Sequence, residues 1–142
     1  MELQKQGQAK DVSHNQWDSA LHKLREVLGE DGISVLYVDK LAYAQDSWPL
    51  WSLHYQRGKL PPTPDVVVWP KSQEQVAQIV AIAQEFALPF VPYGGGSGMA
   101  GGTVPVQGGI VLDMKHLNRV VSLDEEHFAV TAETGIFHEL LE

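Results

Sequence analysis

Six of the nine residues from 94 to 102 are glycines, and such a run can bind a ligand through its backbone N–H groups rather than through side chains. Without Cβ atoms, successive N–H groups can converge on an anion as a concave nest. Glycine loses the most backbone entropy on folding, so six of them at one place need a compensating interaction. Hydrogen bonds to a charged group, each contributing about 1.5–3 kcal/mol, supply one. We therefore expect this loop to bind phosphate, with a diphosphate as the ligand.

Three other interpretations of these glycines compete with a phosphate nest. The P-loop pattern would need lysine where Gly102 stands, so no cation would reach a terminal phosphate. Residues 96–101 match the dinucleotide-binding pattern GxGxxG, which requires a helix to start at the loop. Residues 102–109 are a poor helix start, and Asp113 comes too early to be the ribose-binding acid of that pattern. A flexible surface linker is disfavoured because apolar strands flank the loop.

A strand, a helix and a second strand are expected to position the loop. Residues 66–69 form a continuous apolar run, which is typical of a strand covered on both faces. Ser72 followed by Gln75 is a capping box that opens a helix. The expected core-facing residues of this helix are Val76, Ile79, Val80, Ala83 and Phe86. Pro89 closes the helix, and residues 90–91 begin the second strand, so the order predicts a parallel βαβ unit.

The flanking segments complete an α+β fold. Ser13 or Asn15 is expected to cap a helix that ends at Gly29. The apolar face of this helix is Trp17, Leu21, Leu24 and Leu28. Residues 33–38 favour a short strand, and the stretch from there to Lys59 gives no clear signal.

After the glycines the apolar pattern changes again. Residues 110–112 predict a third buried strand. Residues 120–123 and 128–132 flank a polar run and predict an antiparallel hairpin. The fold class is therefore α+β, with a small parallel sheet and the start of an antiparallel one.

Composition narrows the classes of function. The formal net charge of -8 disfavours nucleic acid as a partner. The absence of cysteine excludes disulfides and thiolate metal sites within this chain. No stretch approaches the roughly 18 apolar residues of a membrane span, and we expect a cytoplasmic protein.

Other chemically capable residues favour structural roles. The histidines show no metal-ligand spacing, and no metal site is expected; they are His14, His22, His54, His116, His127 and His138. Trp48, Trp51 and Tyr55 could line a flavin or contact a further domain, but core packing is favoured. A turn after the third strand is the expected role of Asp113, Asn118 and Arg119.

Three sequence blocks, in this order, carry a resemblance to a known family. They are PDVVVWPKSQEQV, PYGGGSGMAGG, and GIVLDMKHLNRV with AETG behind it. The chain from residue 63 to 135 resembles the FAD-binding domain of the vanillyl-alcohol oxidase and p-cresol methylhydroxylase (PCMH) family. Its branch looks like that of FAD-linked D-lactate dehydrogenase and glycolate oxidase, with alkyl-dihydroxyacetone-phosphate synthase as a close cousin.

The resemblance implies a cofactor and the residues that hold it. These residues would wrap the FAD pyrophosphate: Pro92, Tyr93, Gly94, Gly95, Gly96, Ser97, Gly98, Gly101 and Gly102. Covalent members of the wider family carry histidine where Ser97 stands, so non-covalent FAD is expected. By resemblance Glu133 and Gly135 would also lie near the cofactor, although Gly135 could equally be a plain turn glycine.

The resemblance also implies a division of the chain and an activity. Residues 1–60 would form an N-terminal helix and lead-in, and residues 61–142 the first part of a FAD-binding domain truncated at its C-terminus. The implied reaction is oxidation of a D-2-hydroxy acid, with substrate-binding and catalytic residues beyond residue 142. A non-catalytic binding module and the alkyl-transferring synthase stay open as alternatives, and the oligomeric state is not predicted.

Overall fold

A four-stranded sheet lies at the centre of the computed structural model, which describes residues 14–141. The elements in chain order are α1 His14–Leu28, η1 Glu30–Gly32, β1 Ile33–Ser34, α2 Tyr37–Ala42, α3 Leu50–Gln56, β2 Val66–Val68, α4 Gln73–Glu85, β3 Phe90–Tyr93, β4 Ile110–Asp113, β5 Val120–Asp124, β6 Ala129–Ala132 and η2 His138–Leu140. The strand order is β1-β2-β4-β3, and β2, β4 and β3 run parallel while β1 is antiparallel to β2. The predicted βαβ unit is confirmed, although β4 lies between the two strands that α4 connects.

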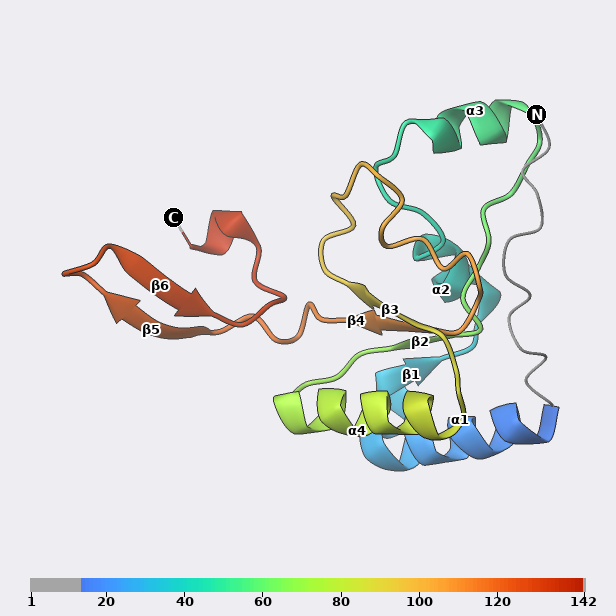
Figure 1. Cartoon of the computed structure of the whole chain (residues 1–142), viewed down its shortest axis with the longest axis horizontal. Coiled ribbons are helices and arrows are strands. Elements are labelled where there is room, and N and C mark those ends of the chain that lie inside the picture. Colours follow the sequence, from blue (N-terminus) through green and yellow to red (C-terminus); the bar gives the residue numbers. More distant parts are fainter. Residues whose placement is uncertain (1–13, 142) are drawn as a thin grey trace.

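Helices cover both faces of this sheet, which explains the continuous apolar strands. In Figure 1, α1 and α4 lie side by side on one face, while α2 and α3 lie on the other. Val66 and Val68 of β2 pack toward α1 and α4, and Val67 packs toward the opposite face with Tyr93. All three valines are 0% exposed, so the predicted two-sided burial is confirmed.

Local signals set the ends of the two long helices. The backbone N–H of Gln75 donates to Ser72 Oγ at 3.3 Å, and Gln75 Oε1 accepts from the Lys71 N–H at 2.7 Å. The predicted cap of α4 is thus present, with Gln75 reaching the amide one residue before Ser72. Helix α1 ends before Gly29, whose φ of 72° is a conformation that favours glycine. Ser13, one of the two predicted caps of α1, lies outside the described residues.

The predicted strand over residues 33–38 is wrong beyond Ser34. The Ser34 hydroxyl accepts the Leu36 N–H at 3.1 Å and donates to the Asp39 carboxylate, which turns the chain into α2. The β-branched residues that suggested a longer strand, Val35 and Val38, are exposed. Helices α2 and α3 occupy the stretch that gave no clear sequence signal.

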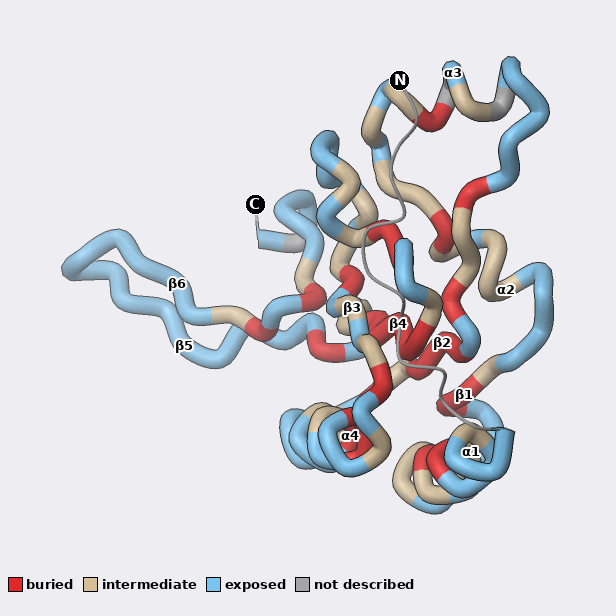
Figure 2. Tube along the Cα trace, turned by 45° about the vertical axis from the view of Figure 1, so that its right-hand side comes forward, coloured by how far each residue is buried: buried red, intermediate tan, exposed pale blue. Residues whose placement is uncertain are grey.

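The predicted antiparallel hairpin is confirmed as β5 and β6. It projects from the sheet, and every residue of β5 is exposed (Figures 1 and 2). None of the helices within residues 14–141 is long and apolar enough to cross a membrane.

Replacing Ser72 by alanine tests how much the cap stabilises α4. Loss of the bond to the Gln75 amide should lower the free energy of unfolding by about 1 kcal/mol. Urea unfolding followed by circular dichroism measures the change. Ser19→Ala, on the exposed face of α1, is the matched control and should cost nothing, because alanine has the higher helix propensity. Equal losses in both variants would contradict this role of Ser72.

Candidate functional site

The glycine loop begins at the carboxyl end of β3 and returns the chain to β4. The carboxyl ends of β2, β4 and β3 share one edge of the sheet because these strands are parallel. Ligands of open α/β sheets bind at this edge. The loop predicted to bind phosphate therefore lies where the topology favours a ligand (Figure 1).

The first part of the loop leaves its amides available. Within residues 14–141, the backbone N–H groups of residues 94–99 donate no hydrogen bond. Gly96 has a φ of 67°, and a Cβ built on it would lie 2.1 Å from the Tyr93 phenol oxygen. A Cβ on Gly94 would meet no protein atom within 4 Å. The bare backbone and free donors suit an oxyanion such as a pyrophosphate.

A second segment, residues 46–48, contacts this loop through hydrogen bonds and side-chain packing. The Gly101 N–H donates to Asp46 Oδ2 at 2.8 Å, and the Ser47 N–H donates to the Gly98 carbonyl at 2.9 Å. The Trp48 ring packs against Gly101, where an added Cβ would lie 3.1 Å from Cε3. We call residues 46–48 the clasp.

A buried carboxylate lies beside the start of the loop. Asp113, at the end of β4, is 1% exposed and accepts from the Tyr43 hydroxyl, the Lys115 backbone N–H at 3.0 Å and the Lys115 ammonium at 3.0 Å. Trp69 Nε1 donates to the Tyr43 oxygen at 3.0 Å. Burial, and then the Asp113 carboxylate, raise the pKa of Tyr43, which therefore stays protonated and donates. The Lys115 ammonium lies 5.3 Å from the centre of the Tyr93 ring, so this cluster braces the residue from which the loop starts.

The nine residues predicted to hold a pyrophosphate fall into two groups. Seven are contiguous from the end of β3 into the loop: Pro92, Tyr93, Gly94, Gly95, Gly96, Ser97 and Gly98. Gly101 and Gly102 lie further along, and the Gly101 amide is already occupied by Asp46. Tyr93 is buried, so its contribution is to support the loop.

Sequence reasoning missed the clasp. Trp51 is 8% exposed and packs edge-to-face on Trp48 at 6.2 Å, as expected for core residues. The side chain of Tyr55 lies outside the described part. The spacing of Asp46 and Ser47 did not predict that they contact residues about 50 positions away in the sequence.

The base of the hairpin is held by an ion pair between Arg119 and Glu133, which the sequence did not predict. Arg119 Nη2 lies 2.7 Å from Glu133 Oε1, and the Arg119 backbone N–H donates to Glu133 Oε2 at 2.9 Å. These bonds hold the pKa of Glu133 below its usual range. Gly135 permits a close backbone approach, because a Cβ there would lie 1.8 Å from the Met114 carbonyl oxygen.

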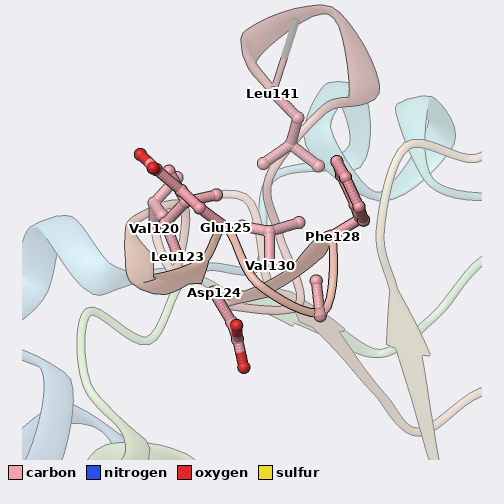
Figure 3. A pocket seen from close by; sticks show the side chains of 8 residues that line it. Val120, Leu123, Asp124, Glu125, Phe128, Val130 and Leu141 are labelled. Carbon is pink, nitrogen blue, oxygen red and sulfur yellow. The ribbon is translucent and has the colours of Figure 1, made fainter.

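A hollow on the surface of the hairpin includes no residue of the glycine loop. It measures ≈ 710 Å³ and is lined by Val120, Leu123, Asp124, Glu125, Phe128, Ala129, Val130 and Leu141 (Figure 3). Phe128 is 96% exposed. Contiguous exposed apolar side chains of this kind mark a surface for contact with another polypeptide or a ligand. Among residues 14–141, no group of three potential metal ligands comes together.

Solved structures define the class of fold. The structure of p-cresol methylhydroxylase with substrate bound superposes with a TM-score of 0.77 at 25% identity, covering 93% of this chain and 25% of that one. A structure of alkyldihydroxyacetonephosphate synthase gives a TM-score of 0.80 at 22% identity, covering 96% and 26%. The fold is thus the PCMH-type FAD-binding fold, as the sequence predicted.

Sequence comparison then identifies the family. Residues 64–142 match the model of the FAD binding domain, so the chain belongs to this family and FAD is its cofactor. Glycolate oxidase subunit GlcD of Bacillus subtilis (strain 168) is 32% identical over 114 residues, covering 80% of this chain and 22% of that protein. A probable mitochondrial D-lactate dehydrogenase of Danio rerio is 33% identical over 124 residues, covering 87% and 23%. The chain therefore spans less than a quarter of the length of these two relatives.

The Arg119–Glu133 ion pair predicts a pH dependence of stability. A carboxyl group whose pKa is lowered on folding adds stability above its unfolded pKa, and this stability is lost as the pH falls through the folded pKa. Glu133→Gln should therefore be less stable than the unsubstituted chain at pH 7, and the difference should shrink below about pH 4. Urea midpoints at both pH values measure it. A difference that stays constant with pH would contradict the ion-pair account.

Proposed function

We propose that this chain forms the pyrophosphate-binding part of a FAD-dependent oxidoreductase that oxidises a D-2-hydroxy acid, such as D-lactate or glycolate. The observation that supports it most is the set of free backbone amides in residues 94–99, at the carboxyl edge of a parallel sheet. The names of the relatives, a glycolate oxidase subunit and a D-lactate dehydrogenase, support the substrate class.

The residues of this chain bind and orient rather than react. The amides of the loop would take the two phosphoryl groups, and residues 92–98, Gly101 and Gly102 would surround them. FAD, when bound, accepts a hydride equivalent from a substrate carbon that bears a hydroxyl group. Because serine stands at position 97, we propose non-covalent FAD at the loop. Substrate-binding and acid–base residues would come from a part of a longer protein outside residues 1–142.

A second candidate is a FAD-dependent alkyl-transfer synthase. The alkyldihydroxyacetonephosphate synthase of Caenorhabditis elegans is 30% identical over 94 residues, covering 63% of this chain and 16% of that protein. Such an enzyme would use FAD without net oxidation of its substrates. A cytoplasmic location and the domain boundary near residue 60 stay predictions.

The substrate class is tested by flavin reduction. Adding D-lactate or glycolate, without oxygen, to a protein that contains this chain together with the parts proposed to lie outside residues 1–142 should bleach the visible flavin absorbance, because electrons pass from the substrate to FAD. L-Lactate is the matched control and should bleach it much more slowly. Flavin that stays oxidised with every D-2-hydroxy acid would contradict the proposed substrate class and favour the synthase.

The phosphate nest is tested by Gly94→Ala. The added Cβ has no protein atom within 4 Å, so the free energy of unfolding should stay unchanged. The methyl group would keep the pyrophosphate from the amides, and FAD affinity should fall about tenfold. Gly95→Val is less clean, because its Cβ would lie 3.0 Å from the Phe137 ring. Quenching of flavin fluorescence measures affinity, and unchanged affinity would place the pyrophosphate elsewhere.

A further inference from the structure

We propose that the clasp, residues 46–48, is the positioning element for the FAD pyrophosphate, and that it turns the amides of Ser97 and Met99 toward the ligand. The proposal rests on the proposed role of the glycine loop as the pyrophosphate site. It assigns a binding role to a segment outside the loop.

The clasp fixes the direction of two loop carbonyls. The Ser47 N–H donates to the Gly98 carbonyl oxygen at 2.9 Å. The Ser47 hydroxyl donates to the Gly96 carbonyl oxygen at 3.4 Å. Both carbonyl groups therefore point toward the clasp.

Peptide geometry then fixes the direction of the next amides. In a planar trans peptide, the C=O of one residue and the N–H of the next point in opposite directions. The N–H groups of Ser97 and Met99 must therefore point away from the clasp. Neither donates a hydrogen bond to any residue within 14–141. Two free donors thus point to the side of the loop opposite the clasp, where the two phosphoryl groups of a pyrophosphate can accept one hydrogen bond each.

Asp46 anchors the far end of the loop. Its two carboxylate oxygens accept different amides: Oδ2 from Gly101 at 2.8 Å, and Oδ1 from Trp48 at 3.0 Å. The Trp48 ring packs on Gly101 from the same segment. A loop with six glycines in nine residues is otherwise free to adopt many conformations, and ordering it during binding would lower affinity. The clasp orders it before the ligand arrives.

The charge of Asp46 gives the proposal a test with a definite sign. A carboxylate near a phosphate site repels the ligand, so its removal should tighten FAD binding if charge alone matters. If Asp46 acts by positioning the loop, its removal should weaken binding. These two expectations are opposite.

The experiment compares Asp46→Ala and Asp46→Asn in the full 142-residue chain. FAD and ADP, which both carry a pyrophosphate, should bind about tenfold more weakly to Asp46→Ala. Asp46→Asn should be intermediate, because one amide oxygen can still accept one of the two N–H groups. Riboflavin, which has no phosphate, should bind as before. Unchanged or tighter FAD binding by Asp46→Ala, or an equal loss for riboflavin, would overturn the proposal.

Asp124→Ala is the matched control. It removes the same charge from the tip of the hairpin, where Asp124 pairs with His127, and it should leave the affinities for FAD and ADP unchanged. An equal loss in this variant would show that general destabilisation explains the result and would overturn the proposal.

Amide hydrogen exchange tests the clasp without any cofactor. In the free chain, the amides of Ser47 and Gly101 should exchange slowly, and those of Ser97 and Met99 rapidly. Asp46→Ala should make Gly101 exchange rapidly. Rapid exchange at Gly101 in the unsubstituted chain would overturn the clasp. If the exchange pattern is as expected but the chain binds neither FAD nor ADP, the proposed function fails at the pyrophosphate site, and the binding role of the clasp is overturned with it; only its structural contacts with the loop are then retained.

Discussion

Backbone amides without an acceptor inside the protein are the constraint on which this structure depends. Residues 94–99 present N–H groups that no described residue accepts. Such a loop is stable only if its ends are fixed and a ligand or solvent completes its hydrogen bonds. The buried ends of β3 and β4 fix it on one side, and the clasp fixes it on the other.

The rest of the fold supports this arrangement in layers. Helices α1 and α4 cover one face of the sheet, so the strands that carry the loop are packed against them on that face. The Asp113 cluster on the other face braces Tyr93, the last residue of β3. The hairpin stands outside these layers, with its apolar side chains exposed. Such an exposed apolar surface is typical of a site of contact with another polypeptide or a ligand.

The sequence predicted the elements whose signals are local. The capping residues Ser72 and Gln75, the doubly buried strand β2 and the glycine loop all follow from neighbouring residues. The clasp was missed because its bonds join residues about 50 positions apart and end on main-chain atoms of the loop, which no residue type reveals. The strand expected from Ile33 was too long, because the Ser34 hydroxyl accepts a backbone hydrogen bond that ends the strand. Apolar periodicity does not predict such a bond. Residue spacing also gave no hint that the hairpin would be exposed on both strands.

The central proposal is that the backbone of the glycine loop, rather than the hairpin, takes the pyrophosphate of FAD. Nitrogen–proton correlation spectra of the labelled chain, recorded while ADP is added, test it most directly. The account predicts that the amide signals of residues 94–99 move together to saturation, while those of the hairpin tip, residues 124–128, stay in place. Signals that move at the hairpin, while those of the loop stay unchanged, would contradict it.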